Sequence, residues 1–375
     1  MKTTKIYKLS TIVLLLAILA ACAPQPAPTP EKVEVVKTVK VIETVIVEGS
    51  PVVQEKIITA TPEPTKPAMD KVSLRTNWLW YGSHAIFFLG KKLGLYPDQN
   101  IDVDVKQGNG SGNVVRLVAN KDSDFGYVSS VTMMKLAAQG APIISVATID
   151  AQGADAVLCR PDSGVKEFKD LEGKQIMTTA GAGVNTLFPV AVAKAGLDMN
   201  KIKIINVAEN ALVQSYLQNL APCILGGLDD KPAEIKANGG EPPVILSYTD
   251  QGVFQPGYSI VAHKDMVKEN PELVRRFVLA TCQAVKAAQE DPEAAIQSLI
   301  DWQSSVGDNK EQALEVLGVT LSILMSPNNK DKVLCKNIPE DWASALELLK
   351  QYSGVETNMK PEEFYTNEFV PETLP

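Results

Sequence analysis

The chain has few of the side chains that most enzymes use for catalysis. It contains 2 histidines, His84 and His263, among 375 residues. The patterns HExxH, GxSxG and GxxxxGK[ST], which are the signatures of a zinc protease, an α/β-hydrolase and a P-loop nucleotide site, are absent. The glycines at 108, 110 and 112 do not satisfy GxGxxG. We therefore expect no catalytic residue, no cofactor and no metal.

Cysteine is also scarce, and its spacing excludes the common metal and redox motifs. Besides Cys22, the chain has Cys159, Cys223, Cys282 and Cys335, which are too far apart for a CxxC pair. Outside the cell these four residues can form two disulfides in three alternative pairings, and the sequence does not choose among them. Their apolar neighbours are at least as compatible with buried free thiols.

Positive charge is in deficit. The 36 lysines and arginines are outnumbered by 44 aspartates and glutamates, which leaves a net charge of −8. Nucleic acid requires a basic surface, so this balance argues against a nucleic-acid partner. It also argues against capture of an anionic substrate by bulk charge alone.

Long apolar runs are missing, and the most apolar segment lies at the N-terminus. Lys2, Lys5 and Lys8 make a positively charged region, and the apolar run from Thr11 to Leu19 follows it. Because this run is too short to span a bilayer, residues 1–21 are predicted to be a secretory signal peptide.

The signal ends in Leu19-Ala20-Ala21-Cys22, which resembles the lipobox of bacterial lipoproteins. The resemblance implies that Cys22 is acylated, with chains such as palmitate, and becomes the mature N-terminus. Each buried CH₂ would hold the protein to the cell membrane by about 0.8 kcal/mol, on the extracytoplasmic face. The alternative is an ordinary signal peptide with a chance cysteine.

Residues 22–69 show no globular pattern and are expected to be a lipid-anchored flexible linker. Prolines crowd both ends of this segment and exclude a helix or a central strand there. As a flexible coil it would hold the next domain on the order of 40 Å from the membrane. Its valine-rich middle is compatible with a strand or a helix, and a self-associating stalk is a further alternative.

From residue 70 onward, short strand-like runs alternate with helical ones, which indicates an α/β fold. Two such series are followed by helices alone, beginning at Pro271. We expect two lobes joined by a hinge, with a C-terminal helical tail. The expected division is 70–158 for the first part of lobe 1, 159–257 for lobe 2, and 258–375 for the return to lobe 1 and the C-terminal helices.

Several segments carry a family resemblance. Residues 77–84, Asn-Trp-Leu-Trp-Tyr-Gly-Ser-His, look like the first ligand loop, Asp-Trp-x-Pro-Asn-x-x-His, of solute-binding proteins for thiamine pyrimidine precursors. Asp170-Leu171-Glu172-Gly173-Lys174 is similar to the passage that opens the second lobe of nitrate, sulfonate and taurine binders. Further matches lie at residues 90–96, 108–112 and 138–142. The resemblance implies a type II periplasmic binding protein that delivers a small molecule to ABC permease subunits, and we expect a monomer.

The first loop departs from the family pattern in a way that bears on the ligand. Asn77 stands where an acid is usual, Trp78 and His84 match, and Trp80 and Tyr81 replace Pro-Asn. Flat aromatic faces beside a cleft suit a flat ring, with stacking worth about 0.5–1.5 kcal/mol per pair beyond burial. These five residues are therefore candidate ligand contacts, although packing between lobes would explain one or two of the aromatic residues equally well.

The remaining ligand candidates come from helix openings, from the segment in which the chain returns to lobe 1, and, for Asp229, from the place where members of the resembled family often carry an acid in the cleft. Helix openings expose backbone N–H groups, but Ser, Thr and Asn there are more often ordinary caps. These candidates are Ser111, Ser130, Asn185, Thr186, Asp229 and Tyr258.

Trp80 and Tyr81 are larger than the Pro-Asn that they replace, and larger aromatic walls suggest a larger planar ligand. Riboflavin is therefore the first choice. Hydroxymethylpyrimidine is the second choice, and a sulfonate or nitrate anion is the third, because the motif loops carry no Arg or Lys beyond Arg75. Two other classes remain open. One is a pyrimidine-modifying enzyme, which the missing cysteine cluster and the signal peptide disfavour. The other is a tethered sensor that reports the ligand to a receptor. The sequence does not distinguish a receptor partner from a permease partner.

Overall fold

The computed structural model describes residues 38–47, 50–59 and 68–374. The predicted signal peptide, Cys22 and the two ends of the predicted linker lie outside these ranges. The chain divides into two compact units, Met1–Pro67 and Ala68–Pro375.

The described part of the first unit is a β-hairpin. Strand β1 (Thr38–Val47) pairs antiparallel with β2 (Ser50–Thr59), so that Thr38 lies opposite Thr59 and Val47 lies opposite Ser50. Valine, isoleucine and threonine dominate both strands, and β-branched residues favour extended backbone. The valine-rich segment thus forms strands, which is one of the two alternatives that the sequence left open for it.

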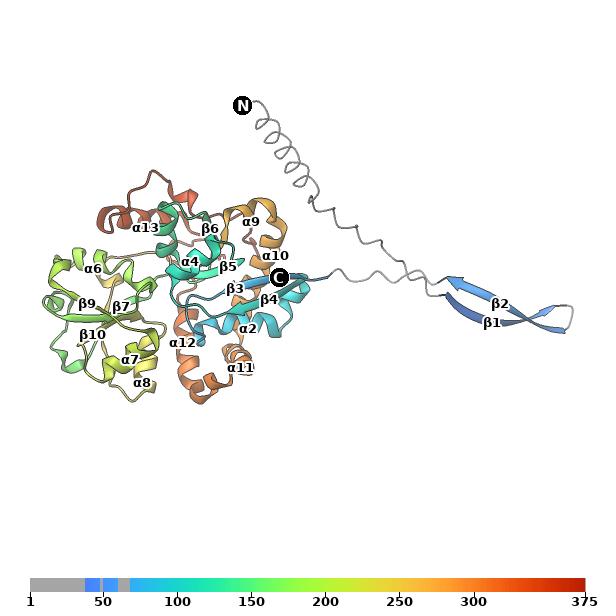
Figure 1. Cartoon of the computed structure of the whole chain (residues 1–375), viewed down its shortest axis with the longest axis horizontal. Coiled ribbons are helices and arrows are strands. Elements are labelled where there is room, and N and C mark those ends of the chain that lie inside the picture. Colours follow the sequence, from blue (N-terminus) through green and yellow to red (C-terminus); the bar gives the residue numbers. More distant parts are fainter. Residues whose placement is uncertain (1–37, 48–49, 60–67, 375) are drawn as a thin grey trace, which may run out of the picture. The chain divides into compact units, whose positions relative to one another are not determined.

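The second unit contains two five-stranded sheets, each at the centre of one lobe (Figure 1). The first sheet has the order β4-β3-β5-β12-β6. Its strands are β3 (Asp70–Arg75), β4 (Ile101–Lys106), β5 (Phe125–Ser129), β6 (Ile143–Thr148) and β12 (Tyr258–His263). Strands β3, β4 and β5 are parallel, whereas β12 runs antiparallel to both of its neighbours.

The second sheet repeats this plan with the order β11-β7-β10-β8-β9. Its strands are β7 (Asp155–Cys159), β8 (Gln175–Thr178), β9 (Lys203–Asn206), β10 (Cys223–Gly227) and β11 (Val244–Ser247). Here β7 is the strand that runs against its neighbours β10 and β11. In each sheet, therefore, the antiparallel strand is the one that the chain enters on crossing from the other lobe.

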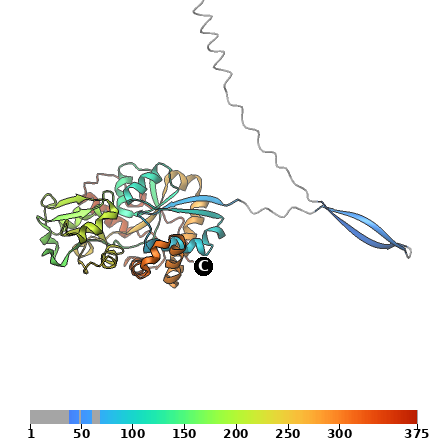
Figure 2. The same cartoon turned by 60° about the horizontal axis from the view of Figure 1, so that its bottom comes forward.

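Helices cover both sheets (Figures 1 and 2). The α-helices are α2 (Ala85–Lys92), α3 (Leu95–Asp98), α4 (Ser111–Ala119), α5 (Ser130–Ala138), α6 (Phe188–Lys194), α7 (Glu209–Leu217), α8 (Lys231–Ala237), α9 (Lys264–Glu269), α10 (Pro271–Glu290), α11 (Pro292–Trp302), α12 (Lys310–Ser322) and α13 (Pro339–Tyr352). Shorter 3₁₀ turns include η1 (Gly82–His84), η4 (Gly183–Asn185) and η7 (Ser304–Asn309). Within the described ranges, none of the helices has the length and apolar character needed to cross a membrane.

The C-terminal helices do not all belong to one lobe. Helices α10 and α11 pack against α2 of the first lobe, where the ring of Phe277 stacks on Phe125 with centroids 3.9 Å apart. Helix α13 instead contacts α5 of the first lobe and α6 of the second. Its buried Trp342 joins a hydrophobic cluster with residues of both lobes, including Val131 and Phe188. The C-terminal tail thus ties the two lobes together on one side.

The α/β fold with two lobes agrees with the sequence analysis, but the first lobe boundary is displaced. Strand β7 begins at Asp155 and pairs with the second sheet, so the predicted division between 158 and 159 falls inside a strand. Strand β10 is the central strand of the second sheet although it ends in two glycines, a residue type that is depleted in strands. The side chain of Lys231 lies where a Cβ on Gly226 would be.

The two segments that cross between the lobes bind each other. The backbone N–H groups of Gly257 and Tyr258 donate to the Asp150 carbonyl at 2.9 and 3.2 Å, and the Gly153 N–H donates to Gln255 at 3.0 Å. A Cβ on Gly257 would collide with the carbonyl oxygen of Gln152, so this close approach requires glycine. These paired crossings form the hinge.

The four cysteines of the second unit form two disulfides. Cys159 bonds to Cys223, its direct partner across β7 and β10, and Cys282 on α10 bonds to Cys335. All four are buried. This pairing selects one of the three combinations that the sequence left open, and it excludes the free-thiol alternative.

We expect removal of the Cys282–Cys335 disulfide to destabilise the protein. The two residues are separated by 53 positions, and closing a loop of this size stabilises a fold by about 4 kcal/mol in the chain-entropy model. The double variant Cys282→Ser, Cys335→Ser should lose about 2–4 kcal/mol of unfolding free energy in urea titrations. Reductant should destabilise the wild type more than this variant. Labelling of four free thiols in the denatured, unreduced protein would contradict the pairing.

Candidate functional site

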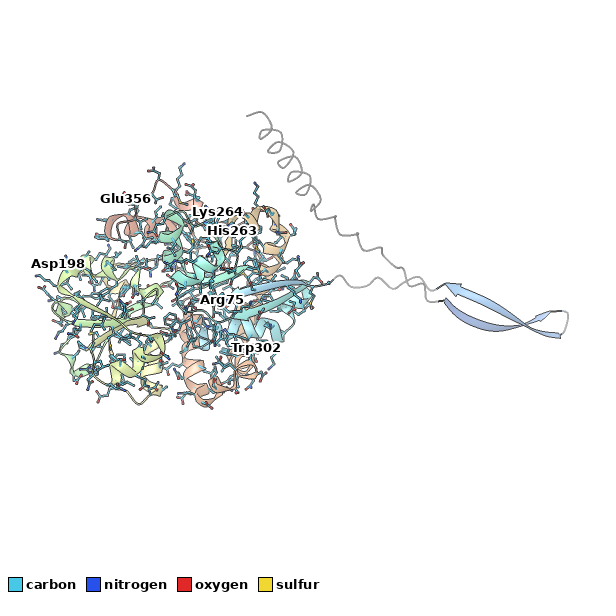
Figure 3. The ribbon with its side chains drawn as sticks, in the orientation of Figure 1. Arg75, Asp198, His263, Lys264, Trp302 and Glu356 are labelled. Carbon is cyan, nitrogen blue, oxygen red and sulfur yellow. A yellow bond between two sulfur atoms is a disulfide. The ribbon has the colours of Figure 1, made fainter. Side chains whose placement is uncertain are left out.

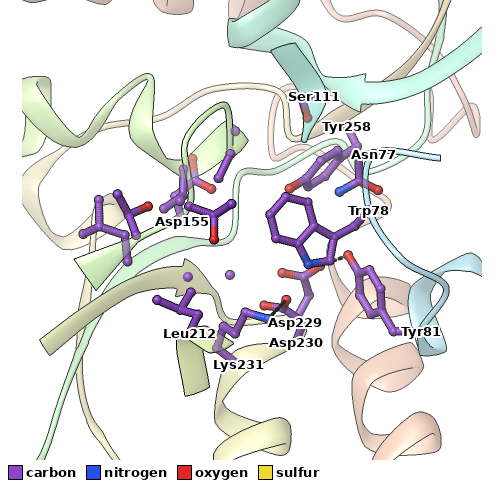
Figure 4. A pocket seen from close by; sticks show the side chains of 18 residues that line it. Asn77, Trp78, Tyr81, Ser111, Asp155, Leu212, Asp229, Asp230, Lys231 and Tyr258 are labelled. Carbon is purple, nitrogen blue, oxygen red and sulfur yellow. Dashed lines mark hydrogen bonds and ion pairs between the residues drawn. The ribbon is translucent and has the colours of Figure 1, made fainter. Parts of the chain in front are cut away.

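The candidate site is a narrow cavity between the two lobes (Figure 4). Its volume is about 50 Å³. Its lining includes the aromatic residues Trp78, Tyr81 and Tyr258 and the acidic residues Asp155, Asp229 and Asp230. Its walls come from loops at the ends of strands in both sheets, the usual position for ligands in open α/β folds. The lobes must separate before a ring-shaped ligand can enter.

Trp78 lies in this cavity, at the end of the loop that follows β3. Its indole projects from the first lobe toward the second (Figure 4), and its Nε1 is buried without a hydrogen-bond partner. The adjacent Asn77 also lines the cavity, and its side-chain oxygen lies 2.8 Å from His84 Nε2. The structure thus provides one indole face and one amide from this loop.

His84 supports the loop from behind and does not line the cavity. It is fully buried, with its ring edge-on to Tyr81 and Tyr127. Burial lowers the pKa of His84 to about 3, so the imidazole is neutral at physiological pH. Its contact with Asn77 makes it a positioning residue, which differs from the ligand contact that we predicted.

Trp80 also lies outside the cavity, although Trp78 and Trp80 are two positions apart. Its ring packs edge-on against Phe88 of α2, with centroids 5.1 Å apart, and it borders a separate hollow beside α12. The 3₁₀ turn η1 starts at Gly82, so the loop does not continue as a strand with alternating faces.

Tyr81 and Asp229 meet across the cleft. The Tyr81 hydroxyl donates to Asp229 Oδ2 at 3.3 Å, which joins the first lobe to the second (Figure 4). Burial, together with repulsion from Asp230 and Asp150, raises the pKa of the Asp229 carboxyl well above its ordinary value. Burial and the nearby Asp229 carboxylate likewise raise the pKa of Tyr81, which keeps its hydroxyl protonated as a donor.

Two further carboxyls lie near the hinge. Burial raises the pKa of Asp150 to about 7, and Tyr127 donates to its Oδ2 at 2.6 Å while Oδ1 has no partner. Burial also raises the pKa of Asp155 to about 7, although Gln255 donates to it at 3.1 Å. The cleft therefore holds more carboxyl groups than it can keep ionised when the lobes are closed.

Lys231 is the lysine that lines the cleft. Its ammonium lies 3.1 Å from Asp230 and 2.7 Å from Glu234. Burial alone would lower the pKa of Lys231, but these two carboxylates outweigh it and hold the pKa above its ordinary value. The lysine is therefore charged and paired, which makes it a poor nucleophile. Among the residues that the structure describes, no group of three or more His, Cys, Asp or Glu could hold a metal ion.

The remaining predicted residues divide between the cavity and its supports. Ser111 and Tyr258 line the cavity; the Ser111 hydroxyl accepts from the Ser129 N–H at 3.0 Å, and the Tyr258 ring stacks on Tyr127. Ser130 is buried outside it, with its hydroxyl 2.7 Å from that of Ser259.

Asn185 and Thr186 also lie outside the cavity, but both make hydrogen bonds close to it. Asn185 braces the turn after β8 through Thr178 and the Thr179 carbonyl, at 2.5 and 2.8 Å. The Thr186 hydroxyl lies 2.7 Å from that of Thr132, a contact between the lobes. We predicted both side chains as ligand contacts, whereas here Asn185 holds the turn and Thr186 contacts the first lobe.

The sequence analysis missed several residues that line the cavity. Asp155 begins the antiparallel strand β7, Thr178 ends β8 and Thr179 follows it, while Leu212 and Lys231 come from α7 and α8. Because ligands gather at the carboxyl ends of parallel strands, the two threonines could have been found from the sequence. Nothing in the sequence indicated Asp155 or Leu212.

Comparison with known proteins places the site in a family context. Residues 82–295, more than half of the chain, match the family described as NMT1/THI5 like. The riboflavin-binding protein RibY of Chloroflexus aurantiacus is 22% identical over 84% of this chain and 90% of its own length. A 4-amino-5-hydroxymethyl-2-methylpyrimidine phosphate synthase of Legionella pneumophila is 21% identical over 81% of this chain and 93% of its own.

A solved structure supports the two-lobed fold. The alkanesulfonate-binding protein SsuA of Xanthomonas axonopodis, bound to MOPS, superposes with a TM-score of 0.61 at 13% identity. The match covers 80% of this chain and 99% of SsuA. This similarity shows the fold of a periplasmic solute-binding protein.

We expect the buried carboxyls to make stability fall as pH rises. A carboxyl whose pKa is raised in the folded state binds more protons when folded, so the unfolding free energy decreases from about pH 4 and levels off above about pH 7. Asp155→Asn should flatten this profile and raise the melting temperature at pH 8. The exposed control Asp122→Asn should leave it unchanged. Parallel profiles for Asp155→Asn and the wild type would show that Asp155 does not titrate in this range.

Proposed function

The chain belongs to the NMT1/THI5-like family, and from this premise we propose that it captures an aromatic, hydrogen-bond-donating heterocycle for an ABC importer. Riboflavin is the first choice and hydroxymethylpyrimidine the second. In this proposal the protein is a lipoprotein, anchored through Cys22 on the extracytoplasmic face of the cell membrane. The function is transport, and the lobes close on the ligand about the paired crossings.

The observation that carries this proposal is the pairing of an aromatic face with carboxylates in one interlobe cavity. Trp78 offers the face of an indole, while Asp155 and Asp229 offer oxygens that accept hydrogen bonds. A flat ring with N–H donors satisfies both. The isoalloxazine ring of riboflavin has an imide N–H and a hydroxylated side chain, and hydroxymethylpyrimidine has an amino group.

The same carboxylates disfavour the third choice, a sulfonate or nitrate. An anion in this cleft would face Asp155, Asp229 and Asp230, and the cleft's lysine is already paired with Asp230 and Glu234. A carboxyl that stays ionised there would repel the anion, and a protonated carboxyl would offer it no positive charge. The similarity to SsuA therefore supports the fold but not a sulfonate ligand.

The similarity to pyrimidine phosphate synthases raises an enzymatic alternative. We propose binding instead, because the cleft lysine is fixed between two carboxylates and the neutral His84 is turned away from the cavity. Neither group is arranged to attack a bound molecule. Product formation from a pyrimidine substrate, absent from a heat-denatured control, would overturn this choice.

Trp78→Ala should weaken binding without a large loss of stability. Burial of an aromatic side chain contributes roughly 1.5–3 kcal/mol, so the affinity for riboflavin should fall at least about tenfold. The matched control is Trp302→Ala, since Trp302 lies half-exposed on the first lobe and does not line the cleft (Figure 3). Flavin fluorescence quenching and thermal melts on both variants test this expectation. A large fall in melting temperature with unchanged affinity would show that Trp78 is a packing residue.

The lipid anchor has a separate test. In the bacterial host, Cys22→Ala should release the protein from the membrane fraction, because the acylated thiol is lost. Mass spectrometry of the N-terminal peptide should show the mature chain beginning at an acylated Cys22 in the wild type. A wild-type chain that begins elsewhere, without lipid, would support the ordinary signal peptide instead.

A further inference from the structure

A second hollow lies beside the cleft, between the loop after β3 and helix α12. The centre of a water-sized sphere can reach about 240 Å³ of it, compared with about 50 Å³ in the cleft. Tyr81 lines both spaces, so they lie on either side of one residue. The second hollow is called the side cavity below.

The chemistry of the side cavity differs from that of the cleft. Its polar lining consists of Gln303, Ser305, Asn309 and Gln312, together with Trp80, and none of the described residues that line it is charged. Amides and hydroxyls beside an indole suit neutral hydroxyl groups, which both donate and accept hydrogen bonds. A carboxylate or ammonium group would find no partner of opposite charge there.

One side chain is available for such a ligand. The Gln312 amide makes no hydrogen bond within the described residues, whereas the Nε1 of Trp80 is buried without a partner and does not open onto the side cavity. Gln303 is already engaged, since it accepts from Gln107 at 3.0 Å and donates to Ser305 at 3.2 Å. Gln312 therefore contributes free donors and an acceptor to the side cavity.

The wall formed by α12 is held in place. A Cβ on Gly82 would collide with the Ala313 carbonyl oxygen, and the hydroxyls of Ser83 and Thr320 lie 2.6 Å apart in the buried interface. Asn309 and Gln312 also border a further hollow between α8 and α12, whose lining includes the charged residues Lys236, Glu311 and Glu315.

We propose that the side cavity is a subsite for a neutral, polyhydroxylated group. Resting on the proposed function, this means that the ligand has two parts, a planar head that donates hydrogen bonds in the cleft and a hydroxylated tail beyond Tyr81. The same chemistry could come from a free polyol. The subsite would select ligands with a tail over ligands that consist of the ring alone.

The test compares riboflavin with lumiflavin, which has the same ring but a methyl group in place of the ribityl tail. Gln312→Leu removes the amide at similar size, and Gln289→Leu, on the exposed face of α10, is the matched control. A net hydrogen bond contributes about 0.5–1.5 kcal/mol, so Gln312→Leu should weaken riboflavin binding roughly twofold to tenfold. Lumiflavin binding should not change, which also shows that the variant is folded. The Gln289 variant should behave as the wild type.

The outcomes separate this proposal from the proposed function. In one outcome the wild type binds riboflavin, while Gln312→Leu changes the affinity for neither flavin or changes both affinities equally. In that case the subsite is wrong while the proposed function stands. If the wild type binds neither flavin, the ligand choice fails, and calorimetry with ribitol decides the subsite. Ribitol binding that Gln312→Leu abolishes would support a free-polyol site. Absence of ribitol binding in that case would overturn the subsite.

Discussion

The rest of the structure depends on the hydrogen bonds between the two segments that cross from lobe to lobe. The Asp150 carbonyl accepts from both Gly257 and Tyr258, and Gly153 donates to Gln255. This pairing brings β7 into the second sheet and returns β12 to the first. Each of these strands runs antiparallel to the strands beside it. As a result the strand ends of both lobes face one cleft. Gly257 is required because a Cβ there would collide with backbone.

The same arrangement explains the electrostatics of the cleft. Asp150 and Asp155 lie at or beside the first crossing, and Tyr258 begins the strand after the second, so these polar groups are buried when the lobes close. Burial disfavours ionised carboxyls unless a partner neutralises them. Lys231 is already paired with Asp230 and Glu234, so it does not neutralise Asp155 or Asp229. These two carboxyls accept instead from the neutral donors Gln255 and Tyr81.

The sequence predicted much of the fold because its elements have strong local signals. Helix α10 begins at Pro271, the residue from which helices alone were predicted to follow. Strand β10 has a weak local signal, because its glycines accommodate Lys231, a residue from the following helix. The site was harder to predict. Trp78 and Trp80 look equivalent in the sequence, yet Trp80 packs on Phe88 because the chain turns at Gly82. His84 matched the motif but supports Asn77 from behind.

The sequence by itself determined the α/β alternation, the two series of strands and the aromatic loop, because these are set by residue preferences over a few neighbouring positions. The tertiary structure alone decided which cysteines pair, which tryptophan faces the cleft, and that carboxyls from the crossing and from the second lobe meet around it. Several of these features depend on contacts between residues 53 or more positions apart, such as Cys282 with Cys335 or Tyr81 with Asp229. Such contacts are fixed by the packing of whole sheets, and no local pattern records them.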